Sequence, residues 1–226
     1  MSDGEALRDR LRADEDPWIG YLVVRHAQPA PWPELVARVA EGLCRLRDAD
    51  VDSEALAAWE AGPFRKVCLR AKEGEWRRLR EGLIDRELDV VVDDALLVLE
   101  PRRRTTAVEQ GLGKLQVCKW THDDLPPADP EAAAGPPAPV LGVLDRGEMG
   151  VGKQLAQAAH AAQLAHLEAT PAARAAWRAA GYAVRPRSCS ADDLRALAGT
   201  PGAAAIHDAG LTEVAPGTLT AVLAPA

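Results

Sequence analysis

Short apolar runs alternate along the chain with segments whose apolar side chains recur every three or four residues. Apolar runs bounded by turn residues predict buried strands, and the helical period predicts amphipathic helices. In the front part we expect a strand at 19–24, helices at 33–47 and around Trp59, a strand at 65–70, a helix at 74–83 and strands at 90–92 and 95–99. In the back part we expect a strand at 140–144, helices at 153–168 and around Trp177, a strand at 183–187, a helix at 192–198 and strands at 203–207 and 219–223.

The two parts follow the same order of elements, which predicts an internal repeat. The tripeptide Ala-Ala-Trp at 57–59 recurs at 175–177, a spacing of 118 residues. Strands that alternate with helices are typical of α/β folds. We therefore predict an α/β protein of two tandem small domains of three-layer type, each with a mixed sheet of about four strands flanked by helices.

A stretch rich in proline, alanine and glycine, DDLPPADPEAAAGPPAP at 123–139, separates the two parts. Such composition sustains neither a strand nor a capped helix, so it predicts a linker. We assign residues 1–104 to a first domain, 105–138 to the linker and 139–226 to a second domain.

The composition excludes several classes of protein. With 226 residues, 47% of them hydrophobic and 27% charged, the chain is long and apolar enough to bury a sizeable core. No apolar run approaches the roughly 20 residues of a membrane span, and the charged start of the chain is unlike a secretory signal. The four cysteines are scattered without a CxxC pair. We therefore expect a cytoplasmic protein with no membrane partner and no disulfide or zinc framework.

A glycine-rich segment follows the strand at 140–144 and opens directly into a helix. The amides of a helix N-terminus, with Lys153 beside them, suit a phosphate or an oxyanion. Residues 147–153 satisfy the GxxxxGK pattern of a P-loop. However, Gln154 stands where Ser or Thr would hold magnesium, and the 88 residues from Pro139 onward are few for a nucleotide-triphosphate fold. A P-loop is therefore the weaker interpretation.

Polar side chains share one face of the helix at 153–168. Lys153, Gln157 and His160 stand at i, i+4 and i+7, which indicates either a face that opens into a site or a solvated face opposite an alanine-rich core face. Asp208 ends the strand at 203–207, where its carboxylate can accept or orient a proton. Asp before Ala-Gly is also common in turns, so both interpretations stay open.

Two segments carry a family resemblance. Residues 149–161, MGVGKQLAQAAHA, resemble the signature helix of the second, archaeal and eukaryotic-type, class of peptidyl-tRNA hydrolases. Residues 206–220, IHDAGLTEVAPGTLT, resemble the closing motif of that family and occur in the expected order. The resemblance covers 139–226 and extends to the front part only as a degraded outline. It implies hydrolysis of the ester that joins a peptide to tRNA.

The resemblance also implies a set of site residues. The expected catalytic residues are Asp208, Lys153, His160, Thr212 and Thr220, and the expected substrate-binding residues are Gly152, Gln157 and Arg146. Asp208 would act on the water or the leaving hydroxyl, and Lys153 would place positive charge at the phosphate or oxyanion. No cofactor is implied, and the His and Cys residues lack metal-ligand spacing.

The resemblance further implies tRNA as partner and, because the family is typically dimeric, an intramolecular pseudo-dimer in which the front copy acts as second subunit. Seven acidic and seven basic side chains balance after residue 138, so the net charge of -7 lies in the front part. That acidity, with Glu148 where the family has lysine, leaves open a second hypothesis. In it the protein is a retired member that binds tRNA or a protein without turnover.

Overall fold

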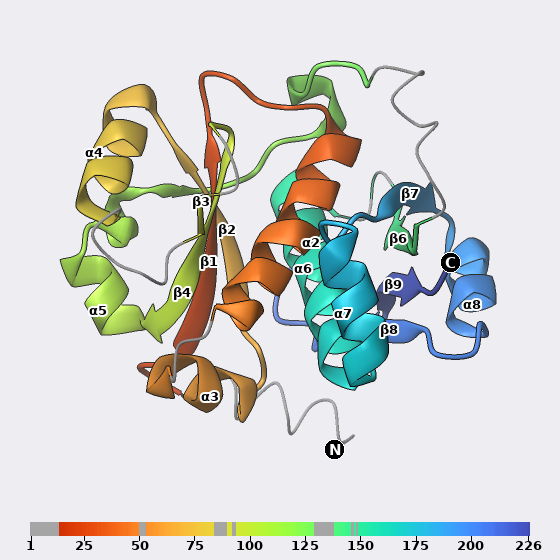
Figure 1. Cartoon of the computed structure of the whole chain (residues 1–226). Helices are drawn as coiled ribbons and strands as arrows, with labels where there is room; N and C mark the ends of the chain where they lie inside the picture. Colours follow the sequence, from red (N-terminus) through yellow and green to blue (C-terminus); the bar gives the residue numbers. More distant parts are fainter. Residues whose placement is uncertain are drawn as a thin grey trace.

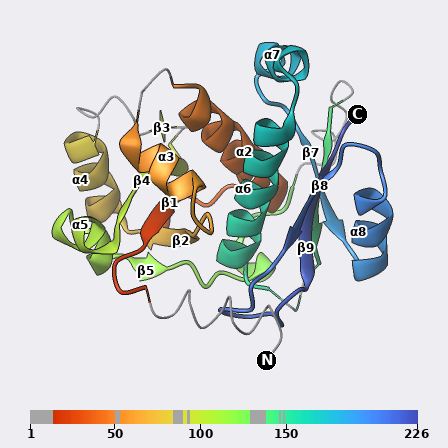
Figure 2. The ribbon, with the colours of Figure 1, turned by 90° about the horizontal axis from the view of Figure 1, so that it is seen from below.

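The computed structural model describes residues 14–49, 53–83, 90–91, 94–128, 138–145, 147 and 149–226. Two β-sheets face each other across a central layer of helices (Figure 1). Further helices cover the outer face of each sheet, so each half is a three-layer unit and the halves share the middle layer (Figure 2). The predicted α/β class is confirmed.

The front sheet has strand order β3-β4-β1-β2-β5. Its strands are β1 (Trp18–Arg25), β2 (Lys66–Ala71), β3 (Val90–Val91), β4 (Leu96–Arg103) and β5 (Gln116–Val117). Its α-helices are α2 (Trp32–Asp48), α3 (Glu54–Glu60), α4 (Glu73–Leu83) and α5 (Arg104–Glu109). β1 and β2 are parallel, and the other pairs are antiparallel. Alternate residues of β1 point to opposite faces, so Leu22 and Val24 meet the central helices while Tyr21 and Val23 meet the outer layer.

The back sheet has strand order β7-β6-β9-β8. Its strands are β6 (Val140–Leu144), β7 (Arg185–Cys189), β8 (Ala204–His207) and β9 (Leu219–Ala224). Its helices are α6 (Val151–Glu168), α7 (Pro171–Ala179) and α8 (Ala191–Ala198). β6 and β7 are parallel, whereas β9 is antiparallel to both β6 and β8.

The two halves repeat one topology. The order β3-β4-β1-β2 matches β8-β9-β6-β7, with the parallel pair at the same place, and only β5 lacks a counterpart among the described residues. In each half a tryptophan indole donates to the backbone carbonyl six residues later, at 2.8 Å for Trp59 and 3.0 Å for Trp177. Phe64 and Tyr182 precede those carbonyls, and both have left-handed backbone with φ of 49° and 56°. These shared details support the predicted internal repeat.

The predicted linker at 105–138 is wrong over its first part. Residues 105–128 include most of α5, strand β5 and two short 3-10 helices, η1 (Leu112–Lys114) and η2 (His122–Asp124). Leu112, Cys118 and Trp120 are buried, because the apolar side chains of this segment complete the first half. The proline-rich composition that predicted a linker belongs to residues further along, and 129–137 lie outside the described residues.

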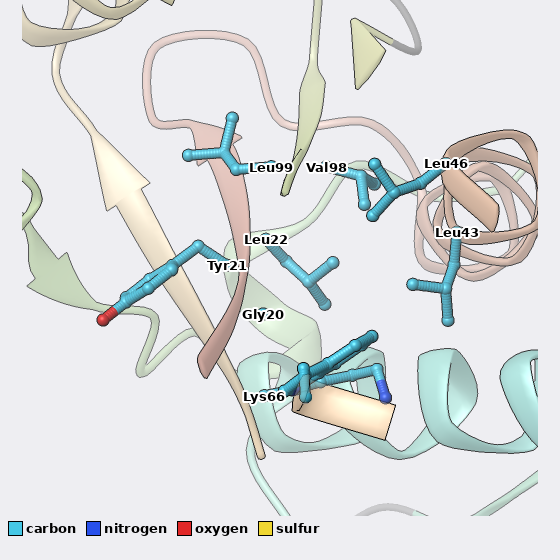
Figure 3. A pocket seen from close by; sticks show the side chains of 9 residues that line it. Gly20, Tyr21, Leu22, Leu43, Leu46, Lys66, Val98 and Leu99 are labelled. Carbon is cyan, nitrogen blue, oxygen red and sulfur yellow. The ribbon is translucent and has the colours of Figure 1, made fainter. Parts of the chain in front are cut away.

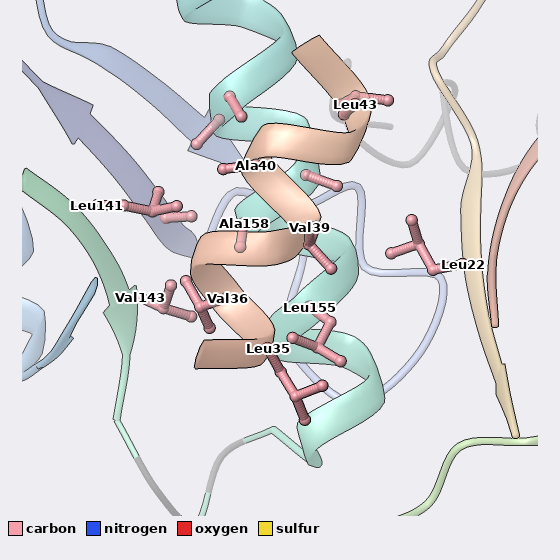
Figure 4. Close-up of a cluster of buried hydrophobic side chains, with 14 of the residues drawn as sticks. Leu22, Leu35, Val36, Val39, Ala40, Leu43, Leu141, Val143, Leu155 and Ala158 are labelled. Carbon is pink, nitrogen blue, oxygen red and sulfur yellow. The ribbon is translucent and has the colours of Figure 1, made fainter. Parts of the chain in front are cut away.

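One hydrophobic core joins the two halves through α2 and α6 (Figure 4). Twelve of the eighteen residues of α6 are buried, on every face of the helix. A helix buried all round needs partners on every side, and α6 contacts α2, β2 and three strands of the back sheet, β6, β8 and β9. The side chains at the centre of this core are Leu22, Leu35, Val36, Val39, Ala40, Leu43, Leu141, Val143, Leu155 and Ala158.

Polar contacts flank this core. The Nε2 atom of His166 donates to Asp48 Oδ1 at 3.0 Å, and Arg47 Nε donates to His166 Nδ1 at 3.2 Å. A ring that donates from one nitrogen and accepts at the other is a neutral imidazole. Burial lowers the pKa of His166 to about 4; the charge of Asp48 opposes this shift, and Arg47 and Arg174 add to it.

Gly20 in β1 lies against the ring of Trp59, beside side chains that leave no space for a water molecule (Figure 3). A Cβ at this position would lie 2.7 Å from an indole carbon. We therefore expect Gly20→Ala to lower the free energy of unfolding by about 1–3 kcal/mol, measured by urea denaturation. The matched control is Gly74→Ala in α4, where a Cβ meets nothing within 4 Å. Equal stability of the two variants would contradict this packing.

The neutral state of His166 predicts a pH dependence. Between pH 6.5 and about 4 the unfolded chain binds a proton at this residue that the folded chain does not, so stability falls as pH falls through this window. The loss should reach about 2 kcal/mol. The measurement is the difference in unfolding free energy between wild type and His166→Gln across that range, since every carboxylate except Asp48, which contacts His166, titrates alike in both. Parallel curves would show that His166 is not held neutral.

Candidate functional site

The candidate site joins the first two turns of α6 to the end of β8. Lys153 Nζ donates to Asp208 Oδ2 at 2.5 Å, and Gln157 Nε2 donates to the same oxygen at 2.8 Å. Thr220 of β9 donates from Oγ1 to Gln157 Oε1 at 2.6 Å. The structure thus brings Lys153, Gln157, Asp208 and Thr220 into one connected hydrogen-bond network.

The loop after β8 holds the Asp208 carboxylate in place. Gly210 donates its backbone N–H to Asp208 Oδ1 at 2.7 Å, and Gly217 donates to the Asp208 carbonyl at 2.7 Å. Gly210 has φ of 71°, and a Cβ there would lie 2.4 Å from Pro216, so this turn requires glycine. Asp208 therefore shapes a turn, as one sequence interpretation predicts, and its side chain also pairs with Lys153.

This network is largely shielded from solvent. Asp208 is 8% exposed, Thr220 is fully buried, and the Lys153 side chain is 13% exposed. A buried charge is costly unless it is paired and hydrogen-bonded, and here the carboxylate accepts three hydrogen bonds, one of them from the ammonium. The ammonium nitrogen carries three N–H donors, and Asp208 takes one of them. The arrangement presents a positive group next to a fixed carboxylate.

Two predicted catalytic residues have other surroundings. His160 Nδ1 lies 3.0 Å from Lys66 Nζ of the front half, and Lys66 also donates to Gln163 Oε1 at 2.5 Å. Burial, followed by the charges of Lys66 and Lys153, lowers the pKa of His160 well below its usual value. Thr212 is exposed in the loop between β8 and β9 and has no hydrogen bond to the Asp208 group. Among the described residues, neither side chain therefore hydrogen-bonds to Lys153, Gln157, Asp208 or Thr220.

The predicted substrate-binding residues lie in different surroundings. A Cβ on Gly152 would lie 2.3 Å from the carbonyl oxygen of Cys118, so glycine here permits the close approach of the two halves. Gln157 is buried and supports Asp208. Arg146 and Glu148 lie outside the described residues.

Protein groups occupy the first amides of α6. Gly150 N donates to Glu213 Oε2 at 2.6 Å, and Val151 N donates to the Trp120 carbonyl at 2.8 Å. The negative groups at this helix end are thus a carboxylate and a carbonyl of the chain itself. Sequence reasoning missed both partners, because neither lies near α6 in the sequence.

The Gln154 side chain is buried and hydrogen-bonded in the core, which the P-loop pattern does not predict. Its Oε1 accepts from the indole of Trp32 at 2.6 Å, and its Nε2 donates to the Met149 carbonyl at 3.2 Å. A P-loop uses this position for a hydroxyl that faces magnesium, whereas the Gln154 side chain joins α6 to α2 in the core. This geometry counts against the P-loop interpretation.

Across the described ranges, three or more His, Cys, Asp or Glu side chains nowhere gather in an arrangement suited to a metal ion. None of the helices in those same ranges combines the length and the apolar composition that crossing a membrane requires. Comparison of the chain with protein-family models, curated proteins and solved structures gave no match.

The Lys153–Asp208 contact predicts strong energetic coupling. Removing one partner leaves the other charge buried and unpaired, so Lys153→Met and Asp208→Asn should each destabilise the protein. The double variant should lose less than the sum of the single variants, with a coupling of about 0.5–3 kcal/mol from urea denaturation. Additive losses would show that the pair does not interact in solution.

Proposed function

We propose that the second half hydrolyses the ester bond of peptidyl-tRNA and releases free tRNA. The observation that carries this proposal is the bond of Asp208 Oδ2 to both Lys153 and Gln157. It connects the two segments that resemble the signature helix and the closing motif of the second-class peptidyl-tRNA hydrolases. Those segments are 45 residues apart in the sequence, from 161 to 206, and their polar residues meet at one point of the fold.

Ester hydrolysis needs a proton acceptor, an oriented water and donors for the developing oxyanion. In this proposal Asp208 takes a proton from the attacking water or orients the leaving ribose hydroxyl. Lys153 supplies positive charge at the oxyanion or at a neighbouring phosphate. As Lys153 turns toward the substrate, it releases Asp208 Oδ2 to accept the proton, while Gln157 and Thr220 keep the carboxylate in place.

The remaining residues have supporting roles in this proposal. In this proposal Lys66, whose Nζ lies 3.0 Å from His160 Nδ1, donates to that nitrogen, and the ring then donates from Nε2 on the same face of α6. Thr212 is exposed on the loop after Asp208, and in this proposal it contacts the RNA rather than the carboxylate. The front half acts as a second subunit in cis, which the shared core of α2 and α6 supports.

The test is a peptidyl-tRNA cleavage assay on the full chain. Asp208→Asn keeps the size of the side chain and removes the proton acceptor, so the rate should fall about 10²- to 10⁴-fold. Binding of uncleaved tRNA should change little, because phosphate contacts do not involve the carboxylate. The matched control is Asp192→Asn on α8, whose carboxylate is 91% exposed and should leave the rate unchanged.

Cleavage that persists in Asp208→Asn would overturn the mechanism. Magnesium-dependent ATP binding that is lost in both Lys153→Ala and Asp208→Asn would instead favour a nucleotide-binding protein. Circular dichroism of each variant separates loss of chemistry from loss of fold.

One observation favours a second candidate, a retired family member that binds tRNA or a protein without turnover. Glu213 and the Trp120 carbonyl already occupy the first two amides at the start of α6, where an anionic substrate group would bind. The same assay separates the candidates. Release of free tRNA well above background supports the hydrolase, whereas tight tRNA binding without release supports the retired member.

A further inference from the structure

Two cysteines face each other across the antiparallel pair β2 and β5. The register pairs Leu69 with Val117 and Arg70 with Gln116, so the next step along the ladder pairs Cys68 with Cys118. The backbone confirms this step, since Cys118 N donates to the Cys68 carbonyl at 2.9 Å. Figure 2 shows β5 beside β2 at the edge of the front sheet. Directly opposed residues on such strands have Cβ atoms roughly 4.5–5.5 Å apart, within reach of a bond between their sulfurs after a small movement.

The surroundings of the two thiols differ. The neighbouring sulfurs shift each other: the pKa of Cys118 is lowered because the Cys68 thiol can donate to a Cys118 thiolate, and the pKa of Cys68 is raised by the same contact and by burial. Burial opposes the shift at Cys118, while the Trp120 N–H and the charge of Arg70 favour its thiolate and the charge of Asp124 disfavours it. Arg70 is fixed nearby by hydrogen bonds to Gln116. One sulfur is thus prepared as nucleophile and the other as its proton donor.

We propose that Cys68 and Cys118 form a redox-active dithiol that hydrogen peroxide converts into a disulfide between β2 and β5. The Cys118 thiolate attacks one peroxide oxygen, the O–O bond breaks, and the products are a sulfenic acid and, after protonation, water. The Cys68 sulfur then displaces the hydroxyl from the sulfenic sulfur, its proton leaves with that hydroxyl as a second water, and the S–S bond forms. The two thiols are oxidised by two electrons and one peroxide is reduced to two waters.

The position of the pair suits a reversible reaction. Both thiols are buried, but β5 is a two-residue edge strand paired to β2 alone, and its Val117 is 53% exposed. Short edge segments of this kind open locally, which admits a small oxidant. Cβ atoms in a disulfide are about 3.8 Å apart, closer than in opposed strand residues, so the bond forms under strain and is readily reduced.

The pair also touches the junction of the two halves. The carbonyl oxygen and Cβ of Cys118 are the atoms that a side chain at Gly152 would strike, one residue before Lys153. A disulfide that draws β5 toward β2 therefore acts on the start of α6. The oxidation itself does not depend on the proposed hydrolase activity.

The experiment uses the full chain, treated with hydrogen peroxide at neutral pH, alkylated in denaturant and digested with trypsin without reduction. Cys68 lies in the tryptic peptide 67–70 and Cys118 in 115–119. We expect mass spectrometry to detect these two peptides joined, two hydrogen masses below their sum, with equal loss of both alkylated forms and return of both on treatment with dithiothreitol. Cys44 and Cys189, buried thiols with raised pKa, serve as internal controls and should stay alkylated.

Intact alkylated Cys68 and Cys118 under conditions that oxidise a free low-pKa thiol would overturn the proposal, as would joining of either cysteine to Cys44 or Cys189. The variant Cys68→Ser, whose hydroxyl keeps a hydrogen-bond donor beside Cys118 but cannot form a disulfide, adds a second measurement. Without its partner, Cys118 should proceed to the sulfinic acid instead of a disulfide, and a Cys118 that stays reduced in this variant would show that it is not the attacking sulfur. Circular dichroism checks that the variant is folded.

Discussion

The burial of α6 on every side is the constraint on which the rest of the structure depends. Small side chains on this helix let α2 approach on one side and the back sheet on the other, and the resulting core belongs to both halves at once. Neither sheet buries its inner face without a helix from the other half. Because the polar residues of α6 must also be satisfied in this setting, each of Gln154, Gln157, Gln163 and His166 has hydrogen-bond partners on another element.

This arrangement explains why the candidate site is rigid. Lys153 and Gln157 sit on a helix that core packing holds from all directions, and Asp208 sits on a turn that glycine and proline fix by contact. The carboxylate and the ammonium are therefore paired before any ligand arrives, and in the proposed reaction Lys153 leaves Asp208 to reach the substrate. The same rigidity means that a ligand must displace a contact that already exists.

The elements of the fold follow closely from the sequence, because strands and helices here are set by local apolar patterning. The strand predicted at 140–144 and the helix predicted at 192–198 match β6 and α8 to within one residue at each end. Long-range contacts are different, since nothing near Gln154 in the sequence indicates that its partner is Trp32, and nothing near His160 indicates Lys66. The linker begins later than predicted for a related reason: the pattern of residues 105–122 is ambiguous between a loop and a short strand, and the pairing of β5 with β2 that orders this segment is a long-range contact. Within the site, the i, i+4 spacing correctly predicts that Lys153 and Gln157 share one face of α6, where both contact Asp208. His160, three residues further along the helix, contacts Lys66 of the front half instead.

The shared helical layer has a consequence for how the molecule is assembled. When two separate chains meet in such a core, the complex dissociates on dilution, because its stability includes the concentration of the partner. Here both surfaces belong to one polypeptide, so their encounter is intramolecular and the local concentration of each for the other is set by the connecting segment. The molecule therefore remains assembled at any dilution. The sequences of its two halves can also diverge, because a substitution in one half leaves the other half unchanged, whereas in a dimer of identical chains it would appear in both subunits.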